Sequence, residues 1–135
     1  MRVVKFNFNK ISIERLKDSY QGVKINSKIN LSDLKRLDKE SEKDSLIQVD
    51  FTYALLYAPE VANIEIGGRI ILITEKAKAK DIEEKWKTKK MTEEFRIFLF
   101  NIILKKANLK ALELEEQVNL PLHIPLPTLK KPKKE

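Results

Sequence analysis

The chain has 135 residues, a formal net charge of +7 and no cysteine. This length suits a single domain, and 42% hydrophobic residues excludes a disordered composition. The missing cysteines exclude disulfides and thiol chemistry and suit a reducing compartment. The first ten residues lack an apolar signal-peptide run, and the longest apolar helical run, 95–104, is too short to cross a bilayer. We therefore expect a cytoplasmic protein that is not inserted in a membrane.

The N-terminal part of the chain predicts two strands. Apolar and polar residues alternate over 4–8, and the alternation slips by one before it resumes at Ile11 and Ile13. A slip of this kind predicts a β-bulge. A second run opens at Gly22 and alternates over 23–31. A period of two with one polar face is typical of antiparallel strands that expose one face to solvent.

Two further strands are predicted after a charged segment. Residues 32–44 lack an apolar face and predict a connecting loop, and the third strand then covers 46–57. A proline breaks that strand, and the fourth strand covers 62–74. Inside it, the glycine pair 67–68 predicts a bend or a second bulge. Residues 70–73 are apolar on both faces, so we expect this stretch to be covered on both sides.

The period then changes to that of helices. Residues 81–87 predict a short amphipathic helix, and Thr92 is a good N-cap for a long helix that ends near residue 118. The fold class is therefore α+β, with a meander-like, four-stranded antiparallel sheet followed by a short and a long helix. We expect a single domain over 1–129, with an extended, proline-spaced segment at 119–127, and a basic C-terminal tail at 130–135.

The long helix is apolar nearly all round over 95–104. One four-stranded sheet cannot cover every side of such a helix, so a second subunit is expected to cover the rest. The predicted oligomer interface consists of Phe95, Phe98, Leu99, Ile102 and Ile103.

Signals for an enzyme are weak. Three glycines cannot supply a phosphate-binding loop, and one histidine, His123, without any cysteine makes a zinc site improbable. The adjacent glutamates 83–84, 93–94 and 115–116 diverge by about 100° on a helix, so they are interpreted as solvated faces. Asp50 is the one acidic residue expected to be partly buried. We predict neither catalysis nor a cofactor nor a metal site.

Two kinds of binding site stay open. Lys85, Lys87, Lys89 and Lys90 could contact phosphates, which would favour nucleic-acid binding, although neighbouring glutamates dilute the charge. The alternative is an apolar groove that binds an extended polypeptide. For that groove the predicted substrate-binding residues are Tyr53, Tyr57, Ile71, Ile73 and Trp86, each of which could instead belong to the core.

The chain resembles the SecB family of protein-export chaperones. The resemblance lies in residues 6–14, in the order of four strands and a long helix, and in the proline-spaced exit from that helix at 118–126. It implies a tetramer built as a dimer of dimers, with helices sandwiched between sheets, that holds unfolded polypeptides in apolar grooves without ATP. The expected partners are such polypeptides and further copies of the chain in a dimer or a tetramer. The net charge of +7 departs from the acidic bacterial members, and the lysine-rich end lacks their metal-binding tail. The expected function is a holdase with a possible role in export, and nucleic-acid binding is the alternative.

Overall fold

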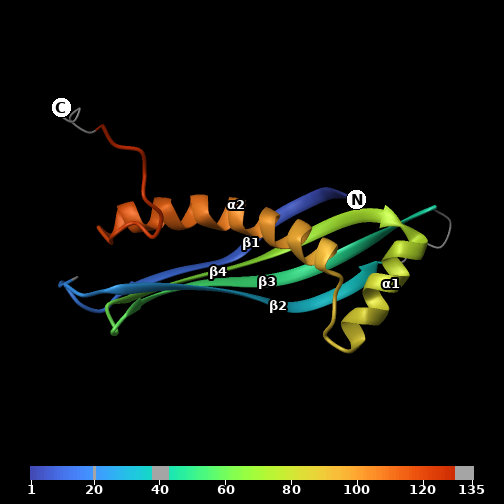
Figure 1. Cartoon of the computed structure of the whole chain (residues 1–135), viewed down its shortest axis with the longest axis horizontal. Helices are drawn as coiled ribbons and strands as arrows, with labels where there is room; N and C mark the ends of the chain where they lie inside the picture. Colours follow the sequence, from blue (N-terminus) through green and yellow to red (C-terminus); the bar gives the residue numbers. More distant parts are fainter. Residues whose placement is uncertain (20, 38–42, 130–135) are drawn as a thin grey trace, which may run out of the picture.

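The computed structural model describes residues 1–19, 21–37 and 43–129. Four strands come first: β1 (Arg2–Arg15), β2 (Lys24–Leu37), β3 (Asp44–Ala58) and β4 (Ala62–Glu75). A short helix, α1 (Lys76–Lys87), and a long helix, α2 (Glu93–Gln117), follow. The predicted α+β class and the order of the elements are confirmed (Figure 1).

The strands form one antiparallel sheet with the order β1-β4-β3-β2. Hairpins join β2 to β3 and β3 to β4. The first strand, β1, pairs with the other side of β4. This is a Greek key rather than the predicted meander. The connection from β1 to β2 is anchored at the β3–β4 turn, where the backbone N–H groups of Leu16 and Lys17 donate to Val61 O at 2.8 and 3.2 Å. Alternation within strands does not reveal which strands are neighbours, so the sequence could not distinguish these topologies.

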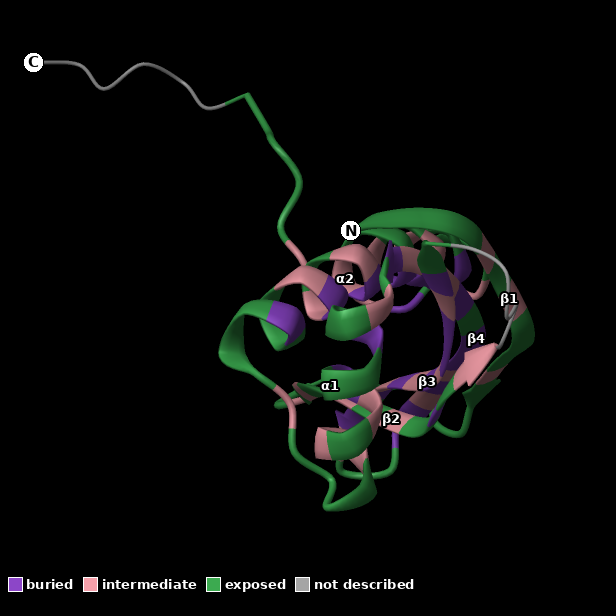
Figure 2. Cartoon of the chain, turned by 90° about the vertical axis from the view of Figure 1, so that its right-hand side faces the viewer, coloured by how far each residue is buried: buried purple, intermediate pink, exposed green. Residues whose placement is uncertain are grey.

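The sheet curls, and both helices lie on its concave side (Figure 2). α2 lies along the sheet, and α1 crosses one end of it (Figure 1). The alternating residues of β3 from Ile47 to Tyr57 point into this concave face and are at most 1% exposed. From α2 they meet a buried row with a spacing of four residues, namely Phe95, Leu99, Ile103, Ala107 and Ala111. This spacing keeps the row on one side of the helix.

The predicted bulge in β1 is confirmed, because the β1–β4 register shifts between Phe8 and Lys10. The β3–β4 register runs without a shift past Gly67 and Gly68, so the glycine pair does not form a second bulge there. Gly68 has a packing role instead. A Cβ atom at this position would lie 2.5 Å from Cζ of Phe51, so the missing side chain makes room for that buried ring.

β2 is longer than predicted. The predicted loop over 32–44 is wrong for its first part, because β2 continues to Leu37. The register shifts between Leu31 and Asp33, and beyond this irregularity Leu34 takes the buried position. The changed phase removed the alternation that would have identified the strand. Residues 38–42 of the predicted loop lie outside the described residues.

The helix predictions hold, with one shifted boundary. α1 begins at Lys76, five residues before the predicted start at 81, because the small side chain of Ala79 packs into the core together with Ile82. Thr92 is the N-cap of α2 as predicted, and its Oγ1 accepts a hydrogen bond of 3.2 Å from the N–H of Phe95. After α2 the described chain has no strand, and the predicted basic tail at 130–135 lies outside the described residues.

The convex face of the sheet is left open by the helices. Ile71 and Ile73 point to this side and are partly buried by their neighbours in the sheet. The expectation of cover on both sides is therefore not met within the described part of one chain (Figure 2). None of the helices in the described ranges is long and apolar enough to cross a membrane.

Candidate functional site

A groove of about 400 Å³ opens between the edge strand β2 and the start of α2. Its lining comes from β2, the end of α1, the α1–α2 connection and α2: Ile29, Asn30, Leu31, Trp86, Lys89, Met91 and Phe100. Five of these side chains are apolar, and all five are only partly buried. An apolar groove that is open to solvent is typical of a binding site.

The tight connection between the two helices positions the aromatic wall of the groove. Lys89 has a φ of 58°, and its N–H donates to Trp86 O at 2.8 Å, which closes the end of α1. Its ammonium lies 4.3 Å from the centroid of the Trp86 ring, a cation–π contact that holds the indole at the rim. The capped start of α2 then fixes Phe100 opposite β2. The groove is therefore bounded by a strand on one side and by the connected ends of two helices on the other.

The structure separates the five predicted substrate-binding residues. Trp86 lies in the groove, whereas Ile71 and Ile73 lie on the convex face of the sheet. Tyr53 and Tyr57 are each 1% exposed and pack beneath α2 in the core. The sequence left open whether these tyrosines bind a substrate or belong to the core. In the structure of the single chain they belong to the core. The groove residues from β2, the connection and α2 were not singled out from the sequence, because their neighbourhood exists only in the folded chain.

The predicted interface residues divide between two sides of α2. Phe95, Leu99 and Ile103 are buried against the sheet of their own chain, whereas Phe98 and Ile102 are only partly buried. Two further apolar side chains of α2, Ile97 and Leu109, are 50% and 62% exposed. One chain therefore covers a single stripe of the helix and leaves its outer apolar flanks open.

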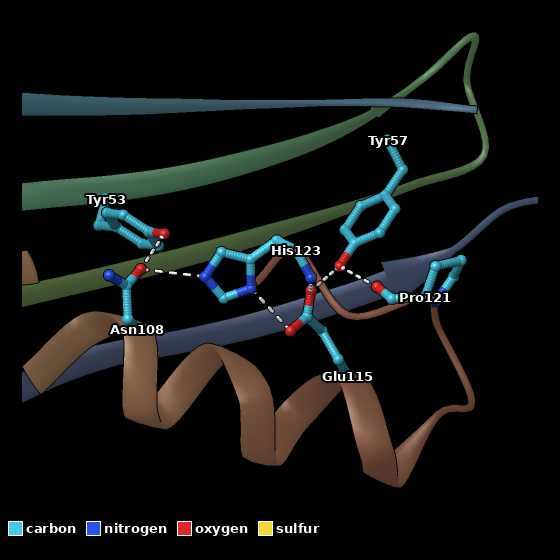
Figure 3. A network of polar contacts seen from close by, with 6 residues as sticks. All are labelled: Tyr53, Tyr57, Asn108, Glu115, Pro121 and His123. Carbon is cyan, nitrogen blue, oxygen red and sulfur yellow. Dashed lines mark hydrogen bonds and ion pairs between the residues drawn. The ribbon is translucent and has the colours of Figure 1, made fainter. Parts of the chain in front are cut away.

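A buried polar network fastens the C-terminal segment to the helix and the sheet (Figure 3). Glu115 of α2 is fully buried; its Oε1 lies 2.8 Å from Nδ1 of His123, and its Oε2 accepts from the His123 N–H at 3.0 Å. The Tyr57 hydroxyl donates to the same carboxylate and lies 3.0 Å from Pro121 O. On the other side of the imidazole, Asn108 Oδ1 lies 3.0 Å from Nε2 and accepts from Tyr53 at 2.7 Å.

The two ring nitrogens of His123 each face an oxygen, Oε1 of Glu115 and Oδ1 of Asn108. The His123 side chain is only 7% exposed and Glu115 is fully buried, so these contacts are shielded from solvent. The interpretation of Glu115 as part of a solvated face is therefore wrong. Its partners come from β3 and from the chain after α2, so helical spacing alone could not reveal them.

The pKa of Tyr53 gives a test of this packing. Burial, helped by the nearby Glu115 carboxylate, raises the pKa of Tyr53 from 10.0 to about 12. Above pH 10 the unfolded chain releases this phenolic proton while the folded chain keeps it, so the free energy of unfolding falls between pH 10 and about 12. We expect a smaller fall in Tyr53→Phe, measured by urea unfolding across this range. Equal slopes in the two proteins would contradict the buried hydroxyl.

The other charged candidates form local pairs. Asp50 accepts a hydrogen bond of 2.8 Å from Nε of Arg69 on the convex face, which raises the pKa of that guanidinium. Among the lysines proposed for nucleic acid, Lys85 pairs with Asp81 at 2.9 Å and Lys89 covers Trp86. Within the described ranges, no cluster of three or more histidine, cysteine or acidic residues could hold a metal ion.

A Greek-key sheet with a short and a long helix on its concave side defines the class of fold, and that fold is SecB-like. The structure is similar to that of a Mycobacterium tuberculosis SecB-like chaperone, solved in complex with a ChAD peptide from the HigA1 antitoxin. The TM-score is 0.54 at 10% sequence identity, and the match covers 98% of this chain and 92% of that chain. The resemblance noted in the sequence is thus confirmed at the level of the fold.

Comparisons of the sequence alone gave no match. No family model matches the chain, and no curated protein is similar to it. At 10% identity the structural similarity establishes the fold and does not carry over the binding of a particular peptide.

Proposed function

We propose that this protein is an ATP-independent molecular chaperone, a holdase, that binds unfolded or extended polypeptides. The observation that carries the proposal is the open apolar groove beside β2, where Trp86, Met91 and Phe100 form the wall opposite the strand. The similarity to a chaperone solved with a peptide supports polypeptides as the kind of ligand. Its clients would be cytoplasmic polypeptides, including proteins that await export.

The groove suits an apolar segment better than a small polar substrate. Burial of apolar client surface gives roughly 25 cal/mol per Å², and it needs no specific side-chain sequence. Asn30 and Lys89 supply polar groups at the rim, which can form hydrogen bonds with the backbone of a client and pair with its acidic side chains. Such a surface binds many sequences with moderate affinity and slows their aggregation.

Assembly is the second part of the proposal. The outer flanks of α2 expose Ile97 and Leu109 and leave Phe98 and Ile102 only partly buried. We infer that a second copy covers these exposed sides of α2 in a homo-oligomer, a dimer or a tetramer. The helix would be held in place for this interface by the residues that pack it on its own sheet, the buried Phe95, Leu99 and Ile103.

Suppression of aggregation tests the function directly. A chemically denatured client is diluted into buffer with the protein in several-fold molar excess and without ATP, and light scattering is followed. We expect strong suppression by the natural protein and at least a several-fold loss in Trp86→Ala, because the indole is the largest apolar side chain of the groove. Leu16→Ala, an exposed leucine outside the groove, is the matched control and should retain activity. No suppression by the natural protein would refute the proposal.

A further inference from the structure

β2 offers a free edge along the groove. Among the described strands it pairs only with β3, and the register is unbroken from Lys24 opposite Ala58 to Leu31 opposite Phe51. In an antiparallel pair, alternate residues turn their N–H and C=O groups away from the partner strand. About four residues of this stretch therefore present backbone donors and acceptors outward, and no other described segment pairs with them.

The two faces of this edge differ sharply in chemistry. On the concave face Ile25, Ile29 and Leu31 are partly buried, and the last two line the groove. On the convex face Lys24 and Lys28 are exposed and form no ion pair with any residue in the described ranges. The nearest acidic residue along the strand is Asp33, which lies beyond the register shift.

We propose that the client binds as an added strand on the outer edge of β2, and that the preferred segments alternate apolar with acidic residues. This inference rests on the proposed function and names the kind of segment that the same groove selects. Successive side chains of a strand point to opposite faces. An added strand would therefore place its apolar side chains in the groove, against Trp86, Met91 and Phe100. Its acidic side chains would lie on the convex face, close to Lys24 and Lys28.

The charges argue against a second copy of this chain as the occupant. Two β2 edges joined antiparallel would bring Lys24 and Lys28 of one copy onto the same face as those of the other. Like charges on neighbouring strands are destabilising, and lysines on an edge commonly prevent such pairing. Acidic side chains on an added strand would relieve this repulsion. Because the hydrogen bonds of an added strand are made by its backbone, the edge can bind segments with many different apolar side chains.

The single tryptophan, Trp86, reports on groove binding through its fluorescence. The probe is a capped octapeptide of alternating valine and glutamate, and peptides of alternating valine and lysine serve for comparison. We expect saturable binding of the acidic peptide and at least tenfold weaker binding of the basic one at low ionic strength. In the double variant Lys24→Glu/Lys28→Glu this preference should reverse. The control Lys105→Glu/Lys106→Glu changes two exposed lysines of α2 and should keep it.

Backbone methylation tests the added strand itself. The acidic peptide is prepared with N-methyl groups on all its valines or on all its glutamates, which blocks the N–H groups of one edge or the other. We expect one of these peptides to bind at least tenfold more weakly than the other. Equal binding of the two, or no binding of the acidic peptide by a protein that still suppresses aggregation, would refute the added strand and leave the holdase function intact. Loss of both activities would refute the function as well.

Discussion

The Glu115→Gln variant is expected to lose about 2–4 kcal/mol of unfolding free energy, because more than one buried hydrogen-bond donor loses its acceptor. The carboxylate is fully buried and is contacted by Tyr57, by the imidazole of His123 and by the His123 N–H. A glutamine keeps the shape but removes the negative charge, and its amide N–H₂ turns a donor toward a neighbour that also donates. Buried donors of Tyr57 and His123 then lose their acceptor, and each buried donor left unsatisfied costs about 1–3 kcal/mol.

Urea unfolding at neutral pH measures this loss. The matched control is Glu116→Gln, which changes the same residue type one position along α2, where the side chain is exposed. We expect the control to stay within about 0.5 kcal/mol of the natural protein. A double-mutant cycle with His123→Ala should give a coupling energy of about 1 kcal/mol or more, because the two side chains are in direct contact. Equal stability of Glu115→Gln and Glu116→Gln would contradict the buried pair.

The elements that could be predicted from the sequence are those whose signals are local. The pattern over 46–57 predicted the strand β3, and Thr92 was predicted as the N-cap of α2, which it is. The features that were missed depend on contacts between distant segments. Glu115 looks like a surface residue until β3 and the chain after α2 bring Tyr57 and His123 to it.

The candidate site shows the same division. Trp86 was singled out as a large apolar residue on a short helix, and it does line the groove. Tyr53 and Tyr57 carried an equal signal, yet their place on the concave face of β3 puts them under α2. Whether an apolar residue of a strand is covered depends on which face the helices occupy, and alternation alone does not specify that face.

Neighbouring isoleucines on α2 allow fold stability and assembly to be tested with the same chemical change. Ile103 is fully buried against the sheet, so Ile103→Ala should lower the free energy of unfolding by about 2–5 kcal/mol. Ile102 lies on the partly buried flank proposed to meet a second copy. Ile102→Ala should therefore have a smaller effect on the fold of each chain and should weaken the oligomer.

Light scattering and urea unfolding at several protein concentrations separate these effects. If α2 is covered by a partner, the stability of the natural protein rises with its concentration, because association favours the folded state. Ile102→Ala should reduce this dependence and shift the mass toward the monomer, whereas Ile103→Ala should lower stability at every concentration. Should the natural protein be monomeric, with a stability independent of concentration, the proposed interface would be wrong. The groove beside β2 would then have to act within a single chain, since all of its walls come from one copy.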